Sequence, residues 1–190
     1  MSIKGTRTEQ NLLKAFAGES QARNRYTYYA SIAQKEGYEQ IAAFFVETAE
    51  NEREHAKVFY KHLEGGEVEI TAAYPAGALG TTAENLLHAA EGELMEWGTL
   101  YPDFAQVAEE EGFPKVAESF REIAKVEAFH EARYRGLLAN VEGGLVFKRP
   151  GSIKWHCRNC GYVHEGPEAP DICPACQHAK KYYEILAENY

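Results

Sequence analysis

Apolar residues recur every three to four positions over most of residues 1–146, and this period predicts four long helices. Capping and helix-breaking residues set the expected boundaries. We expect helices from Thr6 to about Lys35, from Tyr38 to about Leu63, from Thr81 to about Glu111 with a kink or interruption at Pro102, and from Pro114 to just before Gly143. Short turns would join the helices within each pair, and residues 64–81 would cross over between the pairs. This order is typical of a ferritin-like four-helix bundle.

The two predicted helix pairs repeat each other at an offset of 75 residues. The repeat is carried by Glu36-Gly37-Tyr38 with Glu111-Gly112-Phe113, Glu52 with Glu127, His55 with His130, and Phe45 with Phe120. It indicates an internal duplication of a helical hairpin. Glu19 matches Glu93 at an offset of 74, so the third helix has gained or lost one residue. A π-bulge near Pro102 is one way to accommodate that change.

Each predicted helix carries acidic residues on its apolar face, where an unpaired carboxylate would cost several kcal/mol or take up a proton. The residues concerned are Glu19, Glu52, Glu93, Glu96, Glu127, His55 and His130. Antiparallel packing would place them in one layer at similar distances from the two turns. A single Glu-x-x-His on a helix is usually solvated surface, but two matched copies with partner carboxylates indicate a metal site. Carboxylate and imidazole ligands suit iron or manganese.

The number of inward residues exceeds what a plain di-metal bundle needs, which is four Glu and two His. Here there are five Glu and two His. The surplus residue either lies beside the ligands without binding the metal, or it exchanges with another ligand when the metal changes its charge.

The composition changes near residue 145, and we expect a helical domain over residues 1–146, a linker over 147–153 and a small module over 154–190. The module contains two C-x-x-C pairs, Cys157 with Cys160 and Cys173 with Cys176. In a cytosolic protein such pairs indicate a metal held by four thiolates. Zinc would make the site structural, and iron would let it carry one electron. We expect Trp155, Tyr162, Tyr182 and Tyr183 to form the small core around it.

Charge and hydropathy exclude several functions. The net charge of −9 would repel nucleic-acid phosphates, so we expect no nucleic-acid binding. No run of about 18 apolar residues is present to span a membrane. The first ten residues lack the apolar segment of a secretory signal, so we expect a cytoplasmic location.

Four segments, AFAGESQARNRY, ETAENEREHAK, VEAFHEARY and CRNCGYVHEG with CPAC, together resemble the rubrerythrin family over essentially the whole chain. The resemblance implies a mainly α fold, with a non-haem di-iron site in the ferritin-like bundle and one iron in a C-terminal rubredoxin-like domain. It also implies that hydrogen peroxide is reduced to water, with electrons from a reduced pyridine nucleotide delivered through a partner reductase or rubredoxin.

The family's pattern matches this sequence position by position. It implies that Glu19, Glu52, Glu93, Glu96, Glu127 and His130 bind the oxidised iron pair, with Glu52 and Glu127 bridging. It implies that His55 replaces Glu96 on one iron when the site is reduced, which would explain the surplus ligand. Tyr26 and Tyr101 match tyrosines that support the ligands from outside.

A homodimer is expected from both the resemblance and the geometry, because a short linker leaves the C-terminal module at one end of the bundle. A partner docked head to tail could bring its module to the side of the bundle, and a helix exchange through residues 64–81 is also open. Two other functions remain to be weighed. One is a ferritin-like iron oxidation and storage protein, which has no need of the thiolate module. The other is a metal-regulated binding protein with a zinc ribbon, which leaves the buried ligands unexplained.

Overall fold

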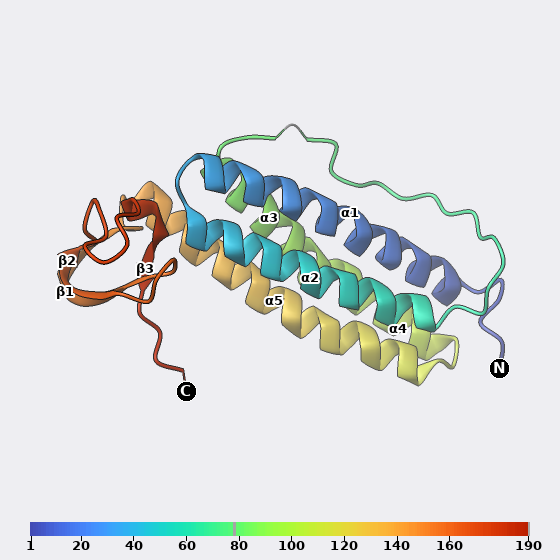
Figure 1. The fold of residues 1–190 in the computed structure, drawn as a ribbon. Coiled ribbons are helices and arrows are strands. Elements are labelled where there is room, and N and C mark those ends of the chain that lie inside the picture. Colours follow the sequence, from blue (N-terminus) through green and yellow to red (C-terminus); the bar gives the residue numbers. More distant parts are fainter. Residues whose placement is uncertain (78, 190) are drawn as a thin grey trace.

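The computed structural model describes residues 1–77 and 79–189; Ala78, in the expected crossover, and Tyr190, in the expected C-terminal module, lie outside the described residues. Two helical hairpins lie side by side (Figure 1). The first hairpin consists of α1, Arg7–Lys35, and α2, Glu39–Lys61; the second consists of α3, Thr82–Met95, the π-helix η1, Glu96–Leu100, α4, Tyr101–Glu110, and α5, Pro114–Glu142. The predicted four-helix bundle is therefore confirmed, with α3, η1 and α4 together forming its third rod.

The turns of the two hairpins have the same backbone geometry. Gly37 and Gly112 have φ values of 87° and 82°, in the left-handed region that favours glycine. The N–H groups of Tyr38 and Phe113 each donate at 2.8 Å to the carbonyl five residues earlier. Both helices thus end in the same Schellman motif, as the repeated Glu-Gly-aromatic triplet predicts.

Each hairpin also caps the other. Glu36, in the first turn, accepts a hydrogen bond from the Thr82 N–H at the start of α3, at 3.0 Å. Glu111, in the second turn, accepts from the Thr8 N–H at the start of α1, at 2.8 Å. A carboxylate at a helix N-terminus satisfies an unpaired N–H and interacts well with the helix dipole. These reciprocal caps hold the two hairpins in register at both ends of the bundle.

The third rod is irregular just upstream of Pro102 rather than at that residue. Pro102 lies at the second position of α4, where the N–H that proline lacks is not required. The irregularity is the π-helix, in which the Tyr101 N–H donates to the Glu96 carbonyl five residues earlier. Glu19 matches Glu93 at 74 residues and Tyr26 matches Tyr101 at 75, so the π-helix lies where the extra residue must be. The predicted π-bulge is confirmed.

The bundle interior has two apolar clusters along its length. Near the turn of the first hairpin the cluster includes Tyr26, Tyr29, Phe45 and Tyr134, and near the other end it includes Phe59, Tyr101, Phe104 and Phe120. Edge-to-face and tilted contacts join the rings within each cluster, with centroids about 5–6 Å apart. The acidic layer described below lies between these clusters.

The crossover segment between α2 and α3 runs extended along the outside of α1 (Figure 1). It is fastened near its middle by the Tyr74 hydroxyl, which donates to the Lys14 carbonyl at 2.7 Å. None of the helices in the described part of the chain is long and apolar enough to cross a membrane.

The C-terminal module contains a three-stranded antiparallel sheet in the order β2-β1-β3. Its strands are β1, Lys148–Cys157, β2, Val163–Glu168, and β3, Tyr183–Ile185, with a short 3-10 helix η2 at Lys180–Tyr182. Residues 148–153, expected as a linker, instead belong to β1, because the strand pairs with β2 from Lys148 onward. The pairing shifts register between Lys148 and Ile153, where Pro150 and Gly151 interrupt the ladder.

The module packs against the bundle end that carries the α1–α2 turn (Figure 1). The Lys181 ammonium contacts the Glu39 carboxylate at 2.6 Å. The rings of Tyr38 and Phe147 stack with their centroids 6.2 Å apart. The module is therefore fixed at one end of the bundle, away from the middle where the acidic layer lies.

Candidate metal centres

All seven metal-binding residues predicted for the bundle are buried, none more than 9% exposed. They come from every rod: Glu19 from α1, Glu52 and His55 from α2, Glu93 from α3, Glu96 from η1, and Glu127 and His130 from α5. The helical period thus brings the predicted charged layer into the core.

Six of the seven residues converge in two groups, each with ligand atoms within 4.8 Å of one another. The first group is Glu19, Glu52, His55 and Glu127, and the second is Glu52, Glu93, Glu127 and His130. Glu52 and Glu127 belong to both groups, so their carboxylates can bridge two ions. The geometry fits a pair of metal ions, each with one further carboxylate and one histidine.

Unpartnered polar atoms in this layer support the same conclusion. Within the described residues, the buried atoms that make no well-aligned hydrogen bond include Glu19 Oε2, Glu52 Oε1, Glu93 Oε2, both Glu127 oxygens and His130 Nδ1, although the Glu127 oxygens and Glu52 Oε1 lie within 3.3 Å of a histidine Nδ1. Buried charges without partners are strongly destabilising, and divalent cations would satisfy all of these atoms together. Oxygen and imidazole nitrogen donors suit iron.

The buried carboxylates of this layer also repel one another, which shifts their pKa values. Burial raises the pKa of Glu19, Glu93 and Glu96 well above 4.5, and repulsion from neighbouring carboxylates raises it further. The layer therefore attracts positive charge, which protons or metal ions can supply.

The two histidines face the shared carboxylates through Nδ1. His55 Nδ1 lies 2.8 Å from Glu52 and 2.9 Å from Glu127, and His130 Nδ1 lies 2.8 Å from Glu127. Burial opposes protonation, but these contacts raise the pKa of His55 to about 10 and that of His130 to about 8. Burial alone would raise the pKa of Glu52, yet hydrogen bonds with His130 and His55 lower it. Nδ1 is thus the nitrogen aimed at the metal positions.

Tyr26 and Tyr101 lie where the sequence predicted supporting tyrosines. Tyr26 donates to Glu93 Oε1 and Tyr101 donates to Glu19 Oε1, so each tyrosine crosses to the other hairpin. Both are buried, and burial together with the nearby carboxylates raises the pKa of each phenol well above 10. The phenols therefore remain protonated donors and leave the other oxygen of each carboxylate free for metal.

Glu96 belongs to neither group among the described residues. It lies on the wall of a cavity of about 280 Å³ between α1, the third rod and the crossover segment. A Cβ at Gly18 would lie 3.9 Å from Glu96 Oε1 and 3.7 Å from the Tyr74 ring, both ordinary van der Waals distances, so the α1 backbone at Gly18 packs directly beside both side chains. His55, and not Glu96, completes the first group in this structure.

Two residues at the site were not predicted from the sequence. Tyr74 covers the cavity beside Glu96, but a tyrosine in a long connection gives no signal of such a role. Asn51 Oδ1 lies 3.2 Å from His130 Nε2. A polar residue next to Glu52 is usually part of the helix surface. Asn51 stands out only when the two repeats are compared, because the equivalent position in the second repeat is Val126.

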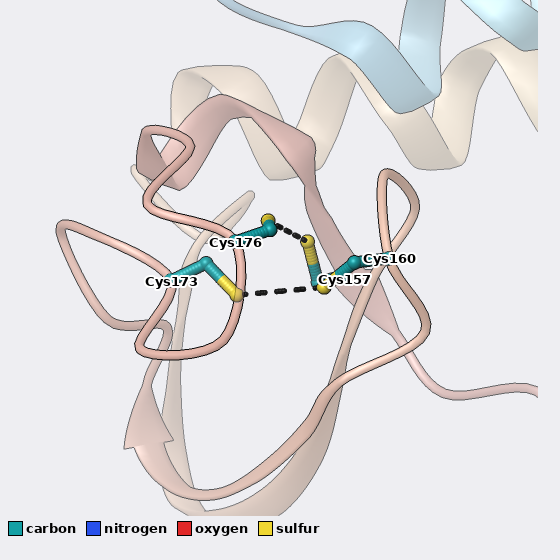
Figure 2. A group of neighbouring side chains, drawn as sticks. All are labelled: Cys157, Cys160, Cys173 and Cys176. Atoms are coloured by element: carbon teal, nitrogen blue, oxygen red, sulfur yellow. Dashed lines mark hydrogen bonds between the residues drawn. The ribbon is translucent and has the colours of Figure 1, made fainter.

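The four cysteines of the module form a second centre (Figure 2). Their sulfurs point toward one another, with 3.9 Å between Cys157 and Cys176 and 3.7 Å between Cys160 and Cys173. Four sulfurs about 2.3 Å from a tetrahedral metal would be about 3.8 Å apart, so the observed spacing fits a tetrathiolate ion. Cys157 and Cys173 are buried, whereas Cys160 is exposed. The Cys160 edge of this centre is therefore exposed at the surface.

The surroundings of the sulfurs shift the four thiols in different directions: hydrogen bonds to the sulfurs lower the pKa of Cys173 and Cys176, whereas burial raises the pKa of Cys157 and hydrogen bonds between sulfurs raise that of Cys160. The His178 N–H donates to Cys176 and lowers the pKa of that thiol to about 6. The Tyr162 N–H donates to Cys160 and by itself would lower the pKa of that thiol. Hydrogen bonds from the Cys160 thiol to neighbouring sulfurs outweigh this effect and raise its pKa to about 12. Trp155 and Tyr183 are fully buried, and Tyr162 and Tyr182 pack against them, as predicted.

Two family models match the chain. Residues 10–138 match the model described as rubrerythrin, and residues 155–184 match the rubrerythrin, rubredoxin-like domain. The matched segments contain every predicted ligand of the bundle and all four cysteines.

Relatives are similar over the full length. A rubrerythrin from Porphyromonas gingivalis is 62% identical over 189 residues, covering 100% of this chain and 94% of the relative. A rubrerythrin from Nitratidesulfovibrio vulgaris is 53% identical and covers 100% of this chain and 99% of the relative. A solved structure of nigerythrin in a mixed-valence state superposes with a TM-score of 0.65 at 29% identity, covering 97% of this chain and 92% of that one.

Proposed function

Because the chain belongs to the rubrerythrin family, we propose that it is a peroxidase that reduces hydrogen peroxide to water at the di-iron centre of its bundle. Membership makes it a di-iron oxidative-stress protein of the oxidoreductase class, with a third iron held by the four cysteines. The observation that carries the proposal is the pair of buried ligand groups that share Glu52 and Glu127.

The bundle residues divide into bridging and terminal ligands under this proposal. Glu52 and Glu127 would be shared by the two irons, because each belongs to both groups. Glu19 and His55 complete one iron, and Glu93 and His130 complete the other. When bound, the iron pair supplies the two electrons that, with two protons, convert one hydrogen peroxide into two water molecules.

The protein's own side chains prepare the site for that chemistry. Tyr26 and Tyr101 hold the carboxylates of Glu93 and Glu19 in fixed orientations through hydrogen bonds. Aromatic clusters above and below the layer exclude water along the bundle axis. The cavity beside Glu96 is large enough for a molecule as small as peroxide and is the access route that we propose.

His55 and Glu96 alternate as ligands in the proposed cycle. His55 lies within the first ligand group, and Glu96 lies just outside it on the cavity wall. The π-helix supports this alternation because it places Glu96 where the matching stretch of α1 has no acidic residue. We propose that His55 binds the reduced pair and that Glu96 replaces it after oxidation.

Electrons reach the bundle through the tetrathiolate iron in this proposal. Within one chain the module lies at the bundle end, and Glu52 lies thirteen residues into α2, about 20 Å along the axis. A homodimer that places the module of one subunit beside the bundle of the other would shorten this path. The donor would be a rubredoxin or a reductase that uses NAD(P)H, and a cytoplasmic location would suit both.

Metal analysis and steady-state turnover test the proposed function. The protein should contain three irons per chain and consume NAD(P)H in a peroxide-dependent reaction when a reductase and rubredoxin are supplied. Zinc in place of iron would contradict the catalytic proposal. A large hollow shell in solution would instead favour iron storage, so size-exclusion chromatography separates the two functions.

A further inference from the structure

The two histidines of the bundle are held differently, although the duplication places them in matching positions. The second nitrogen of His130, Nε2, lies 3.2 Å from Asn51 Oδ1 on the facing helix α2. With Nδ1 aimed at the metal position, Nε2 carries the proton and donates to this oxygen. His130 is thereby fixed at both nitrogens.

His55 has no such support among the described residues. Its Nδ1 contacts Glu52 and Glu127, and no hydrogen bond holds its Nε2 in the described part of the chain. At the offset of 75 residues, the position equivalent to Asn51 is Val126 on α5. A valine cannot accept a hydrogen bond, so the repeat leaves His55 attached through one nitrogen only.

We propose that Asn51 is a positioning residue that makes His130 a permanent ligand, and that Val126 leaves His55 free to exchange with Glu96. The inference rests on the proposed alternation of His55 and Glu96 and explains why only one half of a duplicated site alternates. An acceptor on the second nitrogen fixes the orientation and tautomer of an imidazole and makes it a stronger ligand. Without this acceptor His55 is the weaker ligand, which a competing carboxylate can replace.

The surroundings of the two residues agree with this difference. Asn51 is half-buried between the helices, whereas Val126 is 36% exposed. The next residue along the same face of α5, Phe129, is apolar and 62% exposed, while its counterpart on α2 is Glu54. At these two matched positions α5 therefore carries apolar side chains where α2 carries polar ones.

Variants at the two positions test the inference in the full-length, iron-loaded protein. Asn51→Val removes the acceptor, and Asn51→Asp keeps an oxygen in the same place. Val126→Asn adds an acceptor at the position that the repeat makes equivalent to Asn51. Each variant would be compared with the wild type by iron retention against a chelator and by crystal structures of the oxidised and reduced forms.

We expect Asn51→Val to weaken iron binding at the Glu93–His130 position by about 10–100-fold, as losing a partner of a metal-bound histidine generally does. Asn51→Asp should restore retention, which a purely structural role for the amide would not require. Val126→Asn should keep His55 bound to iron in both oxidation states.

Unchanged iron retention in Asn51→Val would overturn the inference. So would an oxidised Val126→Asn protein in which His55 no longer binds iron, as in the wild type. Because Val126 is partly exposed, we expect Val126→Asn to fold, and this variant tests the inference if Asn51→Val does not fold. Failure of the proposed function looks different, because wild-type protein itself would then show no oxidation of its reduced iron pair by peroxide. A wild-type His55 that stays in place in both states would refute the alternation and this inference together.

Discussion

The two helical hairpins are near copies that build one metal site, and their differences show how a duplicated site becomes asymmetric. Each hairpin supplies one bridging glutamate, one histidine and one tyrosine that reaches across to the other hairpin's glutamate. Each also caps the first helix of the other. These shared features create two equivalent metal positions.

The differences lie on one side of the site. The second hairpin contains a π-helix that adds Glu96, and the crossover segment covers a cavity beside it. Asn51 contacts His130, whereas the equivalent position in the second hairpin is Val126, which has no hydrogen-bonding side chain. The duplication thus supplies a symmetric layer that binds two ions, and a few local changes let one position alternate between ligands while the other stays fixed.

The largest effect is expected from removing a residue that both positions share. Glu127→Ala should release both bundle irons, lower the iron content from three per chain to one and abolish peroxidase activity, because both ligand groups lose a carboxylate. Elemental analysis and an activity assay measure the result. Glu122→Ala is the matched control, because Glu122 lies on the same helix but is 60% exposed. Two bundle irons retained in Glu127→Ala would contradict the shared-ligand geometry.

Removing the thiolate centre should separate the bundle from its electron supply. Cys173→Ser is expected to remove the red ferric-thiolate absorption and most of the donor-driven turnover, because a buried sulfur of the tetrathiolate group is lost. Chemically reduced bundle iron should still react with peroxide in a single turnover. Normal turnover with the natural type of donor would show that electrons bypass the module.

Replacing each histidine in turn compares the two hairpins directly. His130→Ala should weaken iron binding in both oxidation states, because His130 is expected to be a permanent ligand. His55→Ala should keep the oxidised iron pair and slow peroxide turnover by roughly 10–100-fold, as expected for a partner of the metal site. Iron analysis of oxidised protein and steady-state kinetics distinguish the two. An oxidised His55→Ala protein that fails to bind iron would refute the alternation of ligands.

The tyrosines should show the smallest and most equal effects. Tyr26→Phe and Tyr101→Phe each remove one hydrogen bond to a buried carboxylate, which should lower the free energy of unfolding by about 1–3 kcal/mol. Urea denaturation followed by helical circular dichroism measures the change, with the exposed Tyr28→Phe as control. A large difference between the two variants would show that the hairpins are less alike around these residues than their contacts indicate.

Much of the bundle could be predicted from the sequence because its signals are local and repeated. Buried glutamates on apolar helix faces have few explanations besides metal, and their matched spacing fixed the layer. The shift between the 74-residue and 75-residue offsets even indicated a π-bulge near Pro102, and the π-helix ends at Leu100, just before that proline. These predictions rested on helical periodicity, which the packing preserves.

Other features depend on contacts that no local pattern encodes. Which of His55 and Glu96 lies among the ligands is decided by side-chain orientation, which the spacing leaves open. The start of β1 was missed because Pro150 and Gly151 normally indicate a connection, while pairing with β2 extends the strand past them. The role of Asn51 depends on His130, 79 residues away on another helix.

A single-turnover experiment tests the central claim most directly, namely that this bundle is a peroxide-reducing di-iron site supplied by the thiolate iron. The wild-type protein would be reduced completely without oxygen and mixed with one equivalent of hydrogen peroxide per iron pair, with absorption spectra recorded over time. We predict rapid appearance of the oxidised di-iron bands. The red ferric-thiolate bands should follow, as the iron held by the four cysteines passes its electron to the bundle. A reduced pair that remains unchanged by peroxide would contradict the account.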